Sequence, residues 1–192
     1  MKRILLIAVY LLFTRLVSAQ IPALALDEHK KYIYYQVVEM PGLSEDSLSR
    51  SAAYFIKEML PKGKQVPTAT PGIVFKDKFL TYTSLTKHES GEVHYALNIE
   101  CKDSKYRYWL TDFTFTPYQR DRYGVFVPTP GIVIPLETAG SKLEKKELDG
   151  YLDQTSAFCI QLGDKLKKYL VEGEKTKKQD QPVVKKIVTD KW

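Results

Sequence analysis

The chain has 192 residues, 44% of them hydrophobic and 27% charged, which is the size and composition of a globular protein with one domain. Its formal net charge of +6 falls by three when Lys2, Arg3 and Arg15 are set aside, and lysines again outnumber acidic residues after residue 172. The folded part is therefore close to neutral, which excludes the strongly basic surface of a typical nucleic-acid-binding domain.

The N-terminus has the pattern of a secretory signal peptide. A short basic start precedes an unbroken apolar run over residues 4–13, and small residues follow at 17–19. We expect residues 1–19 to be cleaved after Ala19 and the protein to be periplasmic or secreted. The alternative is a membrane anchor, but a span needs about 20 apolar residues, and Arg15 interrupts this run too early.

The first predicted elements of the mature chain are a strand and a helix. A leader over residues 20–31 leads into a strand rich in aromatic and β-branched residues that ends near residue 40. Pro41-Gly42 indicates a turn, and Ser44 is a plausible N-cap for a helix that continues to residue 60. Apolar residues recur in this helix at spacings of three and four, which predicts one buried face: Leu48, Ala52, Phe55, Ile56 and Met59.

Residues 64–72 are predicted to be a loop, followed by a strand over 74–85 that bends or breaks near 76–78. A regular hairpin follows, with its turn at Asp103-Ser104, so that positions whose numbers sum to 207 face each other. The expected pairs are Cys101 with Tyr106, Ile99 with Tyr108, Leu97 with Leu110, Tyr95 with Asp112, and Val93 with Thr114. One face of the hairpin is then apolar and requires a covering layer.

The last third of the chain contains a proline-rich insertion and a long helix. Four prolines in residues 116–141 favour a long loop, with a short extended piece near 131–134. The helix is expected over 148–173, with a stripe that faces the sheet: Leu148, Leu152, Cys159, Leu162, Leu166 and Tyr169. We therefore place a single domain at 32–171 and a basic, mobile tail at 172–192.

Cys101 and Cys159 are both expected to face the core between the hairpin and this helix. Export would allow a disulfide between them, and two buried free thiols are the alternative.

Two segments are similar to a known family: YYQVVEMPGLSEDSL near the start and IECKDSKYRYWLTDFTF in the middle. They resemble exported bacterial proteins, mostly from Bacteroidota, known as a domain of unknown function with a TATA-binding-protein-like (TBP-like) fold. The resemblance covers residues 32–170, although Asp103-Ser104 replaces the usual Asp-Gly turn and 116–141 do not align. It implies an α+β fold, a curved antiparallel sheet with helices packed on its convex side, and it implies no activity.

Motifs for enzymatic chemistry are sparse. The three histidines, His29, His88 and His94, share no metal-ligand spacing, and no phosphate loop or nucleophile motif is present, so we expect no metal and no cofactor. Asp112 is expected at the rim of the apolar face, where tyrosine hydroxyls or backbone groups would satisfy it.

The second, mixed face of the hairpin is the predicted functional surface. It carries His94, Asn98, Glu100, Arg107, Trp109, Thr111, Phe113 and Phe115, with Glu100 opposite Arg107 as a favourable pair. Its three large aromatic rings are either covered by the proline-rich loop or the tail, or form an exposed patch for a partner.

Our first hypothesis is an exported, non-enzymatic domain of the cell envelope that binds another protein or an envelope component through this face. The alternatives are an enzyme with a polar site around His94, Glu100 and Asp112, and a purely structural envelope protein. We expect no nucleic-acid partner and no membrane span after signal cleavage.

Overall fold

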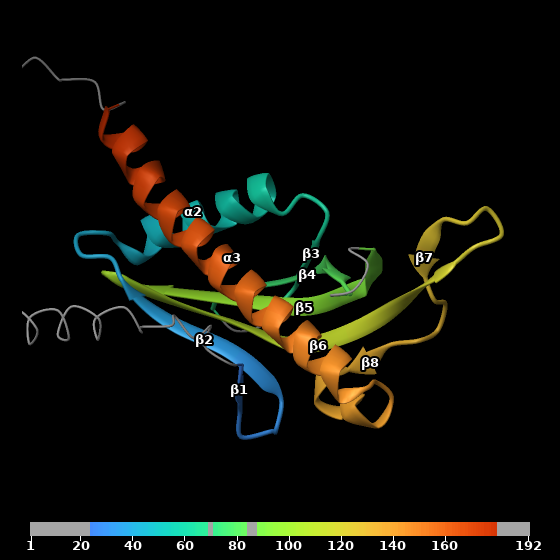
Figure 1. The fold of residues 1–192 in the computed structure, drawn as a ribbon. Helices are drawn as coiled ribbons and strands as arrows, with labels where there is room; N and C mark the ends of the chain where they lie inside the picture. Colours follow the sequence, from blue (N-terminus) through green and yellow to red (C-terminus); the bar gives the residue numbers. More distant parts are fainter. Residues whose placement is uncertain (1–23, 69–70, 84–87, 180–192) are drawn as a thin grey trace, which may run out of the picture.

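A computed structural model describes residues 24–68, 71–83 and 88–179. The predicted signal peptide lies outside these ranges, as do residues 20–23 of the leader and residues 180–192 of the tail. Elements are labelled as in Figure 1.

The strands form a single antiparallel sheet in the order β1-β2-β6-β5-β4-β3, and two further short strands, β7 and β8, pair with β6. Figure 1 shows the curvature of this sheet, along which β5 and β6 form the longest hairpin. The strand bounds are β1 Ala25–Leu26, β2 Tyr32–Glu39, β3 Lys64–Val66, β4 Ile73–Tyr82, β5 Glu89–Lys102, β6 Lys105–Arg120, β7 Phe126–Pro128 and β8 Ile134–Pro135.

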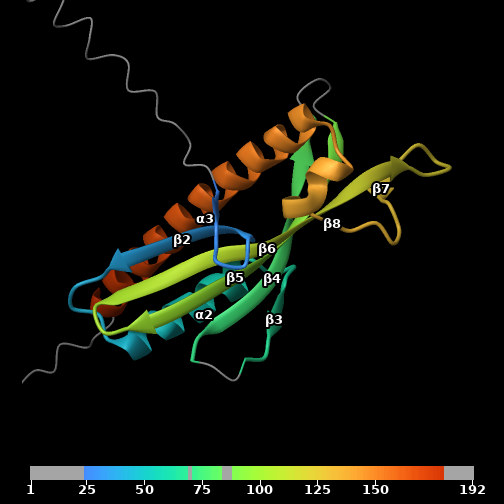
Figure 2. The same cartoon turned by 90° about the horizontal axis from the view of Figure 1, so that it is seen from below.

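Two α-helices cover one face of the sheet: α2 (Glu45–Met59) and α3 (Lys145–Gln179). They lie side by side above the strands in Figure 1, and Figure 2, seen from below, shows no described helix over the opposite face. The predicted N-cap is confirmed, because the side chain of Ser44 accepts a hydrogen bond from the backbone N–H of Ser47. A short 3-10 helix, η1 (Leu136–Ser141), joins β8 to the segment before α3. The predicted α+β, TBP-like arrangement is confirmed.

The core lies between the helices and the helix-facing side chains of the sheet. Large side chains that are fully buried come from α2, from the central hairpin and from α3: Leu48, Phe55, Leu97, Ile99, Tyr106, Leu110, Leu166 and Leu170. The alternating apolar residues of the hairpin thus obtain the covering layer that the sequence required.

The register of the β5–β6 hairpin is confirmed near its turn and is wrong further away. Cys101 faces Tyr106, and the sum of 207 holds as far as Ala96, which faces Thr111. His94, however, faces Thr114, so the register has shifted by one residue. Two residues of β6, Asp112 and Phe113, therefore lie opposite the single residue Tyr95 of β5, which defines a β-bulge. Asp112 has a positive φ of 55°, a left-handed conformation that aspartate tolerates better than most residues.

This bulge corrects the predicted faces of β6. Phe113 and Phe115, expected on the mixed face, are 0% and 1% exposed and lie in the core with Val93. Asp112, expected on the apolar face, is exposed and forms an ion pair with Lys31. Beyond the bulge the odd-numbered residues of β6 point toward the helices, whereas before it the even-numbered residues do so.

Several element boundaries also differ from the prediction. The segment 64–72, expected as a loop, begins with β3, and β4 runs without a break over residues 73–82. The proline-rich insertion is not mainly loop, because β6 continues through Pro117 and the insertion also contributes β7, β8 and η1. Helix α3 extends to Gln179, past the expected domain end at 171.

Cys101 and Cys159 are both free thiols. Cys159 is fully buried in α3, whereas Cys101 is half-buried.

Helix α3 approaches the sheet closely at Gly163. A Cβ atom at this position would overlap the hydroxyl of Tyr108, whereas a Cβ at Gly150 of the same helix would meet no atom within 4 Å. We predict that Gly163→Ala lowers the free energy of unfolding by about 1–3 kcal/mol, because overpacking must displace the helix or the ring. Gly150→Ala is the matched control and should raise it by up to about 1 kcal/mol, the helix-propensity gain alone. Urea denaturation measures both; equal changes for the two variants would contradict the close approach.

Candidate functional site

The open face of the sheet is the face opposite the two helices, and six of the eight predicted site residues lie on it: His94, Asn98, Glu100, Arg107, Trp109 and Thr111. Phe113 and Phe115 do not. The sequence carries a signal for this difference, because apolar residues occupy even positions up to Leu110 and odd positions from Phe113, with the polar pair Thr111-Asp112 between them. Such a phase change in a strand is the expected mark of a bulge.

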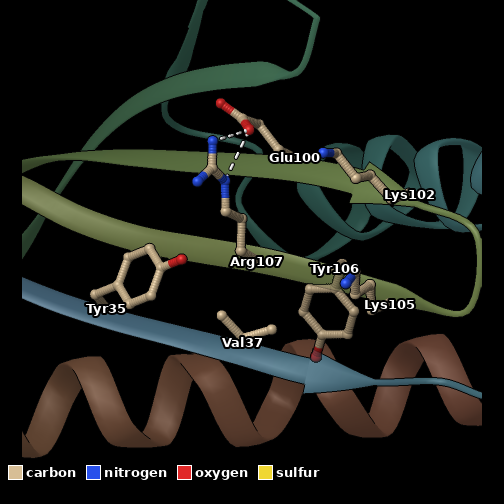
Figure 3. A pocket seen from close by; sticks show the side chains of 7 residues that line it. All are labelled: Tyr35, Val37, Glu100, Lys102, Lys105, Tyr106 and Arg107. Atoms are coloured by element: carbon tan, nitrogen blue, oxygen red, sulfur yellow. Dashed lines mark hydrogen bonds and ion pairs between the residues drawn. The ribbon is translucent and has the colours of Figure 1, made fainter.

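A small hollow of about 230 Å³ lies at the turn end of the open face, and we call it the Tyr35 hollow (Figure 3). It is lined by Tyr35, Val37, Glu100, Lys102, Lys105, Tyr106 and Arg107, from strands β2, β5 and β6. Tyr35 is 46% and Val37 49% exposed, which is high for large apolar side chains on a paired strand. Neither residue belonged to the predicted site, although both occupy alternate positions of the predicted first strand.

Arg107 is held in place on the rim of this hollow. Its Nε and Nη2 donate to the same Glu100 oxygen at 2.8 and 2.5 Å, as the dashed lines in Figure 3 mark. Its guanidinium also lies over the ring of Trp109, 5.4 Å from the centroid, and the rings of Tyr35 and Trp109 are 6.4 Å apart. Tyr35, Trp109, Arg107 and Glu100 thus form a continuous row of planar groups across three strands, a type of surface enriched in protein interfaces.

A second cluster of polar groups, which was not predicted from the sequence, lies further along the open face around Glu92. The Glu92 side chain is only 4% exposed and is surrounded by three donors. Its carboxylate contacts the Lys78 amine at 2.8 Å, the His94 Nε2 at 2.9 Å and the Tyr118 hydroxyl at 2.9 Å. We call these four residues the Glu92 cluster.

The surroundings of Glu92 keep it ionised. Burial by itself would raise the pKa of the carboxyl group, but hydrogen bonds from Lys78, Tyr118 and His94 outweigh it and hold the pKa below the ordinary value of 4.5. Burial and the bond to Glu92 raise the pKa of Tyr118 to about 12. A carboxylate with three donors and a lowered pKa is well satisfied, and it is a weak proton acceptor.

The three residues of the alternative, enzymatic hypothesis each interact with a different partner and do not form one polar site. His94 contacts Glu92, Glu100 bonds with Arg107, and Asp112 pairs with Lys31. His94 and Glu100 are six positions apart on β5, which corresponds to about 20 Å along an extended strand. Asp112 and His94 line a common groove, but Glu100 is not part of it.

Within the part of the chain that the structure describes, no group of three or more histidine, cysteine, aspartate or glutamate side chains is arranged to hold a metal ion. No described helix has the length and apolar character needed to cross a membrane.

Comparison with known proteins agrees with the fold. Residues 34–116, from β2 into β6, match a family model described as a domain of unknown function (DUF4468) with a TBP-like fold. The resemblance drawn from the sequence is therefore confirmed, and the matched segment includes the Asp112 bulge and the row of planar groups. No curated protein matches the chain.

Two solved structures share the fold. A TBP-like protein from Parabacteroides distasonis superposes with a TM-score of 0.57 at 15% identity, over 76% of this chain and 96% of that chain. A DUF4468 family protein from Bacteroides ovatus superposes with a TM-score of 0.56 at 14% identity, over 80% of this chain and 91% of that chain. At these identities the likeness establishes the fold and carries no activity.

We predict that Glu92→Gln destabilises the protein in a pH-dependent way. The folded-state pKa of Glu92 lies below its unfolded value, so its stabilising contribution is present above about pH 4.5 and is lost as the pH falls through the folded-state pKa. At pH 7 the substitution should lower the free energy of unfolding by about 1.5–3 kcal/mol, the range for hydrogen bonds to a charged group.

The measurement is urea denaturation of both proteins at pH 7 and at about pH 3, where the difference should shrink. Glu100→Gln is the control, because its partner Arg107 is half-exposed and such surface pairs contribute less than about 1 kcal/mol. A pH-independent loss for Glu92→Gln would show that its charge does not stabilise the fold.

Proposed function

We propose that this protein is exported and acts as a non-enzymatic binding domain of the cell envelope, which binds another protein or an envelope component through the open face of its sheet. The observation that carries the proposal is the Tyr35 hollow, where exposed apolar side chains lie next to a pre-positioned arginine. Aromatic residues and arginine dominate the binding energy of protein interfaces, since they combine large contact area with directed hydrogen bonds.

The rigidity of this surface supports a binding role. Arg107 is fixed by Glu100 on one side and by Trp109 on the other, so little side-chain entropy remains to be lost on association. The hollow is built on the paired strands β2, β5 and β6, which are more precise supports than loops.

The absence of catalytic activity is also part of the proposal. It is supported by the separation of His94 from Glu100 along β5 and by the three donors that occupy Glu92. A catalytic carboxylate would need a raised pKa or a free lone pair directed at substrate, and Glu92 has the opposite properties.

Export is proposed from the N-terminal pattern of a basic start, an apolar run and small residues before Gln20. We expect the protein isolated from its native cells to begin at Gln20 and to fractionate with the periplasm or the medium. N-terminal sequencing of the purified protein measures this directly. A chain that retains Met1 and stays in the cytoplasm would contradict export.

The binding surface is tested by affinity capture from envelope extract with tagged protein lacking residues 1–19. Trp109→Ala removes the ring that packs against Tyr35 and beneath the Arg107 guanidinium, and we expect it to lose a partner that the unmodified protein retains. Tyr54→Ala is the control, because Tyr54 is an exposed aromatic residue of α2, on the helix side of the domain.

Capture of the same partner by the unmodified protein and the Tyr54 variant, with loss in the Trp109 variant, supports the proposal. Identical capture by all three proteins would place the binding surface elsewhere. Near-native unfolding curves for both variants are required, so that the loss of a partner reports on the surface and not on folding.

A further inference from the structure

The open face also has a positively charged groove at its other edge. This groove has a volume of about 890 Å³ and extends from the α2–β3 connection over β3 and β4 to the centre of the sheet. Its charged lining consists of Lys62, Lys64, Lys76, Lys78, Asp77 and Asp112, and we call it the lysine groove. Asp112 is neutralised by Lys31 and Lys78 by Glu92, but no ion pair among the described residues involves the other three lysines.

Two of these lysines lie directly opposite each other. Lys64 of β3 faces Lys76 of β4 in the antiparallel register, and both side chains are exposed. Like charges at opposed positions destabilise an antiparallel pair, because their Cβ atoms are only about 5 Å apart. Negative charge placed between them would remove this repulsion, so the groove favours an anionic occupant.

The same edge of the sheet offers unpaired backbone. Strand β3 pairs with β4 only up to Lys76, whereas β4 continues to Tyr82. At that far end Gln154 of α3 takes the place of a strand: its side-chain amide accepts from the Tyr82 N–H and donates to the Tyr82 carbonyl, both at 2.9 Å. Between these two ends, residues 77–81 have β5 on one side and no described strand on the other.

We propose that an extended, acidic segment of a partner protein adds to this free edge of β4, between β3 and Gln154. Its backbone pairs with residues 77–81, and its acidic side chains lie against Lys64 and Lys76 on the open face. Addition of a strand to an exposed edge is an established mode of peptide recognition, in which backbone hydrogen bonds give affinity and side chains give selectivity.

The free backbone distinguishes a peptide from an acidic glycan, since only a peptide supplies the alternating donors and acceptors that a strand edge needs. The site is separate from the Tyr35 hollow, because the two share no lining residue: the groove involves residues 94–96 of β5 and Asp112 and Thr114 of β6, whereas the hollow lies nearer the hairpin turn. The inference therefore goes beyond the proposed function and stands without it.

The probe is a capped peptide of alternating glutamate and valine, about ten residues long, a usual strand length. Binding is measured by calorimetry, and pairing by hydrogen exchange of the β4 amides in the unmodified protein. We expect binding that weakens with salt and protection at residues 77–81. Lys64→Glu/Lys76→Glu should weaken binding by at least about tenfold, because two attractions become repulsions.

Two controls isolate charge and backbone. Lys57→Glu/Lys167→Glu makes the same change in net charge on exposed helix positions and should leave the affinity within about twofold. A version of the peptide with alternate backbone nitrogens methylated keeps every charge but loses the donors on one edge, and it should not bind. The Trp109→Ala variant should bind the peptide normally. The experiment therefore distinguishes a failure of the proposed function at the Tyr35 hollow from a failure of peptide binding at the β4 edge.

Equal binding of the methylated peptide would show simple charge attraction and overturn the proposal. Equal binding of oligogalacturonate, an acidic glycan, would overturn the choice of occupant, and equal effects of the two charge-reversal pairs would overturn the location.

Discussion

The β-bulge at Asp112 determines which face of β6 each aromatic side chain occupies, and the division between core and open face depends on it. Without the bulge, Phe113 and Phe115 would lie outside, and Asp112 would point toward the helices. A left-handed aspartate costs about 1–2 kcal/mol, whereas burial of a phenylalanine contributes about 1.5–3 kcal/mol. The free energy gained by burying two phenylalanine rings therefore exceeds the cost of the left-handed conformation. The ion pair with Lys31 satisfies the Asp112 carboxylate, which points outward.

The bulge also divides the open face into two chemically different ends. On the turn side of it, Tyr35, Trp109, Arg107 and Glu100 form a row of planar groups beside a small hollow. On the other side the face becomes polar, with the Glu92 cluster and the lysine groove.

The polar end contains a buried, neutralised carboxylate, that of Glu92, and exposed lysines that have no ion pair in the described part of the chain. Glu92 is buried on a face that no described helix covers, and it remains ionised because three donors replace the water it has lost. Lys64 and Lys76, in contrast, oppose each other, and no ion pair among the described residues involves either of them. The first arrangement stabilises the sheet and the second weakens it, which is why we assign the structural role to Glu92 and the recognition role to the lysines.

The sequence by itself determined the elements whose pattern is local. Alternation over 93–101 and 106–110 fixed the hairpin and its register near the turn, Ser44 fixed the start of α2, and the family resemblance followed from the same segments. Only the tertiary structure decided the rest, because a bulge, the short strand β3 and the partners of Glu92 depend on residues distant in sequence. Asp112 adopts its positive φ because the core gains Phe113 and Phe115, and that gain exists only once α3 and the sheet are packed together.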